Sequence, residues 1–173
     1  IRSVSLLETV EEPVRSDGLV YYRFPRPLRK LIADSSIFAR LEKQVMLHLS
    51  SKYALALYEM VQKRGNLQHK TSETFTVQEL RDLLGVPSNK LTRYNNFKSK
   101  ALNQAVTEVN GLAQHGVEFV EIRKGRKVTH IQLLWRKKSE DELRAAFAEL
   151  NQPRIGRNIR LSERAEAASR RRE

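Results

Sequence analysis

The regular spacing of apolar positions predicts a helix over residues 94–110, followed by two strands. At about 100° per residue, the apolar side chains of this helix fall within one half of the helical wheel: Phe97, Ala101, Leu102, Ala105, Val106 and Val109. Polar and apolar residues then alternate over Val117–Ile122 and Val128–Trp135, which is typical of half-buried strands. Gly125 lies between the two runs, and glycine permits the positive φ that a tight hairpin turn needs. The pattern therefore predicts a helix followed by a β-hairpin.

Two further helices are predicted before this unit. Ser50 or Ser51 can cap a helix that ends at Gly65-Asn66 and buries Tyr53, Leu57, Tyr58 and Val61. Thr76 and Glu79 have the spacing of a capping box, and they precede a helix with one apolar face: Val77, Leu80, Leu83 and Leu84. Gly85-Val86-Pro87 ends this second helix, and Gly111 or Gly116 can end the helix over residues 94–110. The segment Leu80–Val86 is typical of the first helix of a helix-turn-helix.

The two ends of the chain have a different character. Val4–Val10 and Leu19–Phe24 indicate two strands around the polar turn Arg15–Gly18, and Pro25-Arg26-Pro27 opens a short helix, Leu28–Ala33. Ile37–Val45 is open between strand and helix. These elements bury too little surface to fold alone, so we expect residues 1–49 to be the end of an upstream domain. The first residue is Ile1, not Met, which is consistent with a longer natural chain.

At the other end, Ser139–Leu150 is predicted to be an amphipathic helix. The chain beyond Pro153 is Arg-rich and poor in large apolar residues, which predicts a disordered basic tail. The expected fold class is α+β: a winged helix, in which a helix-turn-helix is followed by a β-hairpin wing, preceded by the end of an upstream domain. The expected domains are residues 1–49 as that remnant, residues 50–138 as the winged helix, and residues 139–173 as an amphipathic helix and basic tail.

Composition points to a polyanionic partner. The chain has 173 residues, with 32 Lys and Arg against 20 Asp and Glu, and a formal net charge of +12. Such an excess is the electrostatic footprint of a nucleic-acid binder. There is no cysteine, which excludes disulfides and thiolate metal sites and fits a reducing bacterial cytoplasm. No stretch approaches about 18 apolar residues, so we expect no membrane span.

The exposed side of the helix over residues 94–110, with its N-terminus, has the side chains that read base edges. Asn and Gln pair with adenine, and Lys and Arg pair with guanine or phosphate. The candidates are Arg93, Tyr94, Asn95, Asn96, Lys98, Ser99, Lys100, Asn103, Gln104 and Thr107, of which Lys98 falls near the apolar half of the wheel. A solvated helix face is the competing interpretation, but the adjacent basic hairpin favours DNA. Four cations there would repel one another without a polyanion, and they are candidates for phosphate contact: Arg123, Lys124, Arg126 and Lys127.

Signatures of catalysis are missing from the sequence. No phosphate-binding loop of the Gly-x-x-x-x-Gly-Lys-Ser/Thr type occurs. The four histidines form no His-x-His or His-x-x-x-His pair that would suggest a metal site. Glu118 and Glu121 alternate with apolar strand residues and are expected to face solvent. We therefore expect no enzyme activity, no cofactor and no metal.

Four segments resemble the replication initiators of iteron plasmids, the RepA/RepE type. They are Ser51–Glu59, which resembles that family's "SKYalrLYE" helix, Phe75–Val86, Tyr94–Asn110 with its "fk..vl..av.eiN" pattern, and Ile122–Ile131, which resembles the "kkGRkvthI" wing. The resemblance covers about half of the chain and implies two tandem winged helices, of which most of the first is absent here. It implies non-catalytic binding of repeated origin sequences in double-stranded DNA, recruitment of the host helicase and its loader, and a homodimer formed through the first domain.

Two other functions stay open from the residues themselves. A winged-helix transcriptional repressor would use the same contacts, on a palindrome instead of direct repeats. A protein-interaction domain could present the same basic surface to an acidic partner, in which case duplex DNA would not compete for that surface.

Overall fold

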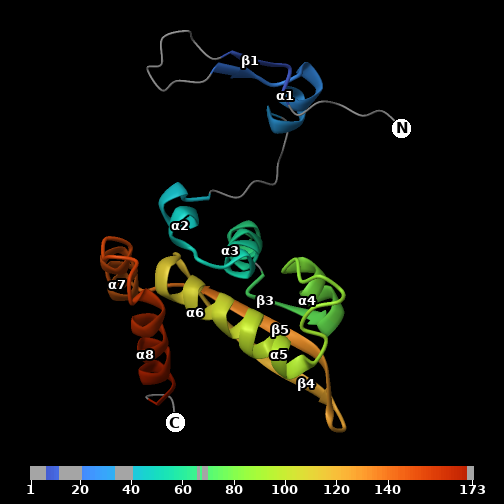
Figure 1. Ribbon diagram of the computed structural model, residues 1–173, viewed down its shortest axis with the longest axis vertical. Coiled ribbons are helices and arrows are strands. Elements are labelled where there is room, and N and C mark those ends of the chain that lie inside the picture. The colour runs from blue at the N-terminus through green and yellow to red at the C-terminus, as the bar shows by residue number, and fades with distance from the viewer. Residues whose placement is uncertain (1–6, 12–20, 34–40, 66, 68–69, 171–173) are drawn as a thin grey trace. The chain divides into compact units, whose positions relative to one another are not determined.

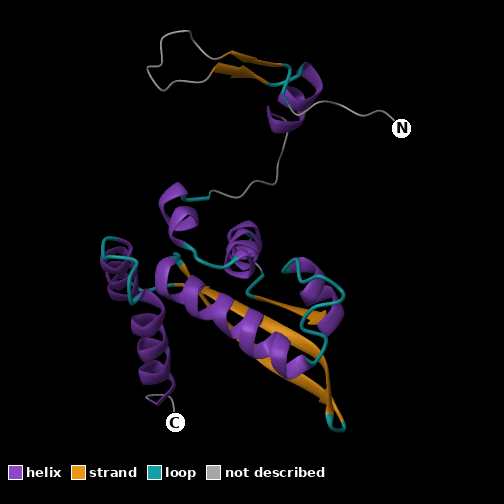
Figure 2. Ribbon diagram, viewed as in Figure 1, coloured by secondary structure: helices purple, strands orange, loops and turns teal. Residues whose placement is uncertain are grey.

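The structure, a computed structural model, describes residues 7–11, 21–33, 41–65, 67 and 70–170 (Figures 1 and 2). The chain forms two compact units, Ile1–Phe38 and Ala39–Glu173. In the first unit, β1 (Thr9–Glu11) pairs with β2 (Tyr21–Arg23) in antiparallel fashion, and α1 (Arg26–Ala33) follows. The predicted turn Arg15–Gly18 and the first three residues of the predicted strand Val4–Val10 lie outside the described residues.

The second unit is built on a three-stranded antiparallel sheet with the strand order β3-β5-β4. Its strands are β3 (Ser72–Thr76), β4 (His115–Lys124) and β5 (Lys127–Lys137). Helices α3 (Lys52–Gly65), α4 (Val77–Leu83) and the long helix before β4 complete the domain. Their order along the chain, helix, strand, helix, helix and hairpin, is that of a winged helix. The predicted α+β fold is therefore confirmed.

The local signals for helix ends correspond to real caps. Thr76 Oγ1 accepts a hydrogen bond from the Glu79 amide at 3.1 Å, and the Glu79 carboxylate accepts one from the Thr76 amide at 2.8 Å. This confirms the predicted capping box. The N-terminus of α3 has a more distant partner, because the buried Glu108 carboxylate accepts hydrogen bonds from the Ser50 amide and hydroxyl, at 2.7 and 2.8 Å. A carboxylate at this helix end satisfies free N–H groups and favours the helix dipole.

The hairpin strands are longer than predicted and contain a bulge. Alternation along β5 places Thr129, Ile131, Leu133 and Trp135 on one side of the strand. The last three are buried as predicted, but Val128 is buried in place of Thr129. The reason is a register shift between Ile122 and Arg123: Ile122 pairs with His130, whereas Arg123 pairs with Val128. The extra residue on β5 reverses the inward-outward alternation towards the hairpin tip.

The chain before α3 joins the second unit. Helix α2 (Lys43–His48) buries Val45 in the core, and the Tyr58 hydroxyl accepts a hydrogen bond from the Glu42 amide at 2.9 Å. The sequence placed this segment with the upstream domain. It packs with the second unit because Val45 of α2 is buried in the core of that unit and Met46 packs against the same core.

The described part of the Arg-rich end, up to Arg170, is folded, which contradicts the predicted disordered tail. Helix α7 (Glu140–Leu150) begins at the expected position, with a capping box between Ser139 and Glu142. After a turn, α8 (Arg157–Arg170) returns along the domain. The Glu149 carboxylate is fully buried and forms ion pairs with three cations of α8: Arg157 at 3.5 Å, Arg160 at 2.6 Å and Arg164 at 3.3 Å. These arginines recur every three or four residues, so they lie on one face of a helix.

Gly111 also differs from its predicted role. It lies inside the helix, which continues to Leu112, and so it does not end that helix. A Cβ atom at Gly111 would lie 2.9 Å from Leu161 Cδ1 and closer still to Cδ2. Leu161 belongs to α8 and is 2% exposed. The missing side chain of Gly111 therefore provides the space in which α8 packs.

Candidate nucleic-acid interface

The exposed helix of the site is continuous but not regular. It consists of α5 (Tyr94–Phe97), a π-helical turn η1 (Lys98–Leu102) and α6 (Asn103–Leu112). In the π turn the Asn103 amide donates to the Lys98 carbonyl, five residues back. Such single π turns inside α-helices are frequent at functional sites.

The π turn follows from the spacing of the buried residues. Phe97, Ala101, Ala105 and Val109 repeat every four residues, and all four are 0% exposed. In a regular α-helix of about 3.6 residues per turn, a four-residue repeat drifts by about 40° at each step. The wider π turn cancels much of this drift, and it keeps the four side chains in the core. The same adjustment sets the direction in which the polar residues of α5 and α6 point.

Most of the predicted base-reading side chains reach solvent. Seven of them are exposed: Arg93, Asn95, Asn96, Ser99, Lys100, Asn103 and Gln104. Tyr94, Lys98 and Thr107 are half-buried. Some exposed side chains also have partners in the helix: Gln104 donates to the Glu108 carboxylate at 3.3 Å, and the Ser99 hydroxyl donates to the Asn96 carbonyl at 3.4 Å. The helix thus presents a polar face along its length.

Arg81 holds the loop that precedes this helix. Its buried guanidinium donates to the carbonyls of Leu91 at 2.5 Å and of Lys90 at 2.7 Å, and it lies 5.5 Å from the centre of the Phe97 ring. Leu91 has a φ of +51°, which a side chain with a Cβ atom rarely adopts. The hydrogen bonds from Arg81 stabilise this conformation and so fix where α5 begins.

The hairpin tip is a compact group of cations. Lys124 pairs with Lys127 in the ladder, which leaves a two-residue turn of Gly125 and Arg126. Gly125 has a φ of +62°, as the first central residue of a type II′ turn requires. The four predicted wing residues are all exposed: Arg123, Lys124, Arg126 and Lys127. The predicted tight turn is therefore confirmed, and Figure 1 shows the hairpin extending beyond the helices.

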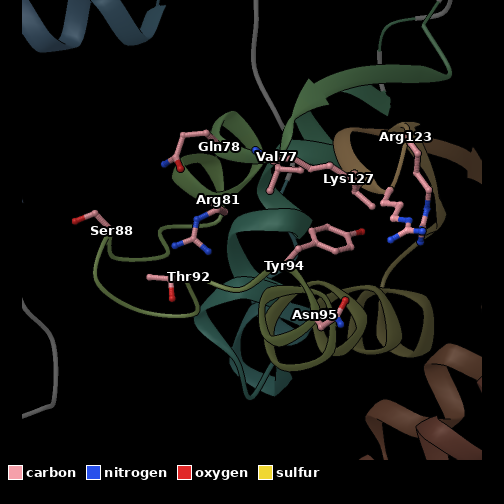
Figure 3. Close-up of a pocket in the computed structure, with 11 residues that line it drawn as sticks. Val77, Gln78, Arg81, Ser88, Thr92, Tyr94, Asn95, Arg123 and Lys127 are labelled. Carbon is pink, nitrogen blue, oxygen red and sulfur yellow. The ribbon is translucent and has the colours of Figure 1, made fainter.

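A groove of about 700 Å³ lies between the start of the exposed helix, α4 and the hairpin (Figure 3). It brings together five of the sequence-predicted residues: Tyr94, Asn95, Arg123, Arg126 and Lys127. The predicted residues further along the helix are not part of its lining. The sequence did not single out the lining residues Gln78, Arg81, Ser88 and Thr92. For Ser88 and Thr92, their place in the polar loop after Pro87 is the feature of the sequence that could have identified them.

Glu121 connects the helix to the hairpin, although the sequence placed it in solvent. Its Oε1 atom accepts a hydrogen bond from the Tyr94 hydroxyl at 2.9 Å and lies 2.7 Å from Lys98 Nζ. Its Oε2 atom lies 2.6 Å from an Arg123 nitrogen. The side chain is only 14% exposed. The prediction was wrong because Glu121 lies on the face of β4 that the helix covers. Tyr94 and Lys98 of that helix supply two of its donors, and Arg123 of β4 supplies the third.

The electrostatics of this cluster follow from its geometry. Lys98 and Arg123 lower the pKa of the Glu121 carboxyl to about 2, and Tyr94 adds a further hydrogen bond in the same direction. Burial raises the pKa of the Tyr94 hydroxyl, and so does its bond to the carboxylate. Between these two pKa values Tyr94 is a neutral donor and Glu121 an anion, so the hydrogen bond between them persists.

Other site types find no support in the part of the chain that the structure describes. No group of three or more His, Cys, Asp or Glu side chains there could hold a metal ion. No helix among those residues is long and apolar enough to cross a membrane.

This part of the chain is similar to known proteins. Residues 76–135 match the family model described as "Initiator Rep protein, WH2". The crystal structure of the Pi initiator protein in complex with iteron DNA has a TM-score of 0.63 and 21% sequence identity with the chain. The match covers 81% of this chain and 61% of the Pi chain, so the present chain spans less than two thirds of that protein. At this identity the likeness shows a shared fold. No curated protein matches the sequence.

Proposed function

We propose that this chain, which carries an initiator Rep protein winged-helix domain at residues 76–135, binds duplex DNA at repeated origin sequences and initiates plasmid replication without catalysing a reaction. One observation carries the proposal: the start of the long helix, at Tyr94 and Asn95, and the cationic hairpin tip line the same groove, and the polar face of the helix continues from there. A base-reading helix beside a backbone-binding hairpin is how winged helices bind a duplex.

The base-reading role is assigned to the exposed face of α5, η1 and α6. Asn95, Asn96, Asn103 and Gln104 can each pair with adenine edges, and Lys100 with guanine. Ser99, Thr107 and Arg93 complete the polar surface as hydroxyl and cationic donors. Tyr94 and Lys98 enter the proposal through the Glu121 cluster, since both side chains are held there.

The backbone role is assigned to the hairpin tip, that is, to Arg123, Lys124, Arg126 and Lys127. Phosphate contacts fix the position of a protein on the duplex and contribute affinity without sequence information. The four exposed cations lie within five consecutive residues on a rigid hairpin, which is suited to this task.

The proposal includes the expected domain arrangement and partners. Residues 50–138 would act as the second winged helix and the preceding residues as the end of a first, through which a homodimer would form. The family resemblance supports the host helicase and its loader as the partners that supply catalysis. Co-purification of the helicase or loader with the DNA-bound chain, and its loss without DNA, tests that part.

The test of DNA binding begins with selection from a random pool of duplexes, because the sequence of the repeat is unknown. Fluorescence anisotropy then compares the enriched duplex with a scrambled one over a series of salt concentrations. We expect tighter binding to the enriched duplex, and tighter binding still to its direct repeats. Equal affinity for both duplexes at moderate salt would refute sequence-specific binding, and preference for a single palindrome would indicate a repressor.

Two variants separate the assigned roles. Asn103→Ala should cost about 1–3 kcal/mol on the enriched duplex and relax specificity. Arg126→Ala should weaken binding to all duplexes alike and reduce the salt slope by about one. Arg144→Ala is the matched control, because Arg144 is 77% exposed on α7, away from the hairpin. An unchanged slope in Arg126→Ala would contradict the assignment of the hairpin.

A further inference from the structure

Glu121 is a carboxylate placed among the cations of the proposed DNA surface. Lys98 and Arg123 lie in direct contact with it, and the other hairpin cations follow within six residues along the chain. An anion at this place repels phosphate and reduces the positive field that draws DNA to the surface. The carboxylate therefore weakens unselective attraction to the duplex.

The contacts of Glu121 restrain both sides of the groove. Lys98 Nζ lies 2.7 Å from Oε1 and 5.7 Å from the centre of the Phe119 ring, so its charge is directed inward, away from the exposed helix face. Arg123 is held at 2.6 Å by Oε2, and the Tyr94 hydroxyl donates to Oε1 at 2.9 Å. Tyr94 and Arg123 both line the groove. One carboxylate thus fixes a helix residue and a hairpin residue relative to each other.

Stability alone is a weak reason for this arrangement. Ion pairs that remain partly in contact with solvent contribute little to folding, and Lys98 and Arg123 are 38% and 57% exposed. The hairpin is already joined to the domain by an eleven-residue strand, β5, that pairs with both neighbours. What the cluster does supply is a defined position for two groove side chains and a lower local charge.

We propose that Glu121 is a positioning residue that determines specificity: its carboxylate withholds Lys98 from phosphate and orients Tyr94 and Arg123 in the groove. The inference rests on the proposed DNA binding and names how that same surface is tuned. Without the carboxylate, Lys98 is free to reach the DNA backbone. DNA binding then gains a phosphate contact that does not depend on the base sequence. It also loses the fixed groove geometry on which sequence-dependent contacts rely.

The test compares Glu121→Gln with wild type and with Glu118→Gln. Both substitutions remove one negative charge from β4, but Glu118 is exposed on the opposite face of the strand. Anisotropy over a salt series measures affinity for the selected duplex and for scrambled DNA. For Glu121→Gln we expect tighter binding to scrambled DNA and a salt slope steeper by about 0.9, the value for one added phosphate contact. The ratio of the two affinities should fall on the order of fivefold, the equivalent of one lost positioning hydrogen bond.

The double variant Glu121→Gln, Lys98→Ala distinguishes this role from a structural one, because its salt slope should return to the wild-type value. Glu118→Gln should leave both the slope and the affinity ratio near wild type. If Glu121→Gln behaves like Glu118→Gln, or if removing Lys98 does not restore the slope, the inference is wrong.

Two further measurements keep the outcomes separate. If circular dichroism shows that Glu121→Gln does not fold, Glu121→Asp replaces it, because aspartate keeps the charge on a shorter side chain. Specificity should then fall without tighter binding to scrambled DNA. An unchanged affinity ratio would refute the positioning role. If wild type itself shows no preference for any selected duplex, it is the proposed function that fails. If wild type discriminates and the Glu121 variants do so equally well, only this inference fails.

Discussion

Replacing Gly111 with alanine tests whether α8 is packed on α6. If α8 were a solvated tail, alanine would stabilise the domain by roughly 0.5–1 kcal/mol, because it is the better helix former. In the structure the new methyl group would instead overlap both Leu161 methyl groups, one of them at 2.9 Å. The two accounts therefore predict changes of opposite sign.

The magnitudes follow from the packing around Leu161. Inserting a methyl group into a filled space costs about 1–3 kcal/mol, so after the gain in helix propensity Gly111→Ala should destabilise by about 1–2 kcal/mol. Leu161 is 2% exposed, and Leu161→Ala should cost about 2–4 kcal/mol as a buried truncation. In the double variant, the alanine methyl at position 111 occupies part of the volume that Leu161 vacates. The double variant should then be about 1–2 kcal/mol more stable than the sum of the two single changes implies.

Urea unfolding followed by circular dichroism gives the free energies of all four proteins. Leu143→Ala is the matched control, since Leu143 is 38% exposed on α7 and its truncation should cost well under Leu161→Ala. Additive effects, or a stabilising Gly111→Ala with a neutral Leu161→Ala, would refute the packing of α8 on α6.

Three other changes have expected outcomes. Glu149→Gln leaves the buried Arg157 without its anion, and it should lower the free energy of unfolding by about 3–5 kcal/mol and expose α8 to limited proteolysis. Arg81→Met removes the hydrogen bonds to the loop before α5. It should lower the free energy of unfolding by about 2–3 kcal/mol and speed hydrogen exchange in that loop. In acid, Glu121 and Glu142 have folded-state pKa values of about 2, below their ordinary value of 4.5. Their contribution to stability is complete above pH 4.5 and is lost as the pH falls towards 2; thermal melts should show a loss of roughly 1–3 kcal/mol after screening, smaller in Glu142→Gln.

Local patterns predicted the helices and the hairpin of the winged helix, but not the strand β3. The capping box of Thr76 and Glu79 and the glycine of the hairpin act within a few residues, so their effect can be read from neighbours along the chain. The apolar face of residues 94–110 and the alternation in the hairpin predict which sides are buried. The four cations at the tip and the polar helix face were visible for the same reason, since exposed side chains are positioned by the element that carries them.

Tertiary structure decided the features that depend on distant partners. Glu121 contacts Tyr94, 27 residues away along the chain, and Lys98 of the same helix. Its alternation with apolar residues suggested a position facing solvent, but the helix covers it. The arginines of α8 had the composition of a disordered tail, but the buried Glu149 pairs with three of them and Leu161 packs on α6.

The sequence by itself determined the order of the helices and the hairpin of the winged helix, and which side of each is mostly polar; it did not determine β3 or α8. It could not determine that Gly111 makes room for Leu161 or that a π turn keeps Phe97 and Val109 on one side. Spacing along the chain reports the period of a helix or strand. The close packing of a core, and the pairing of a buried charge, depend on which surfaces meet in space.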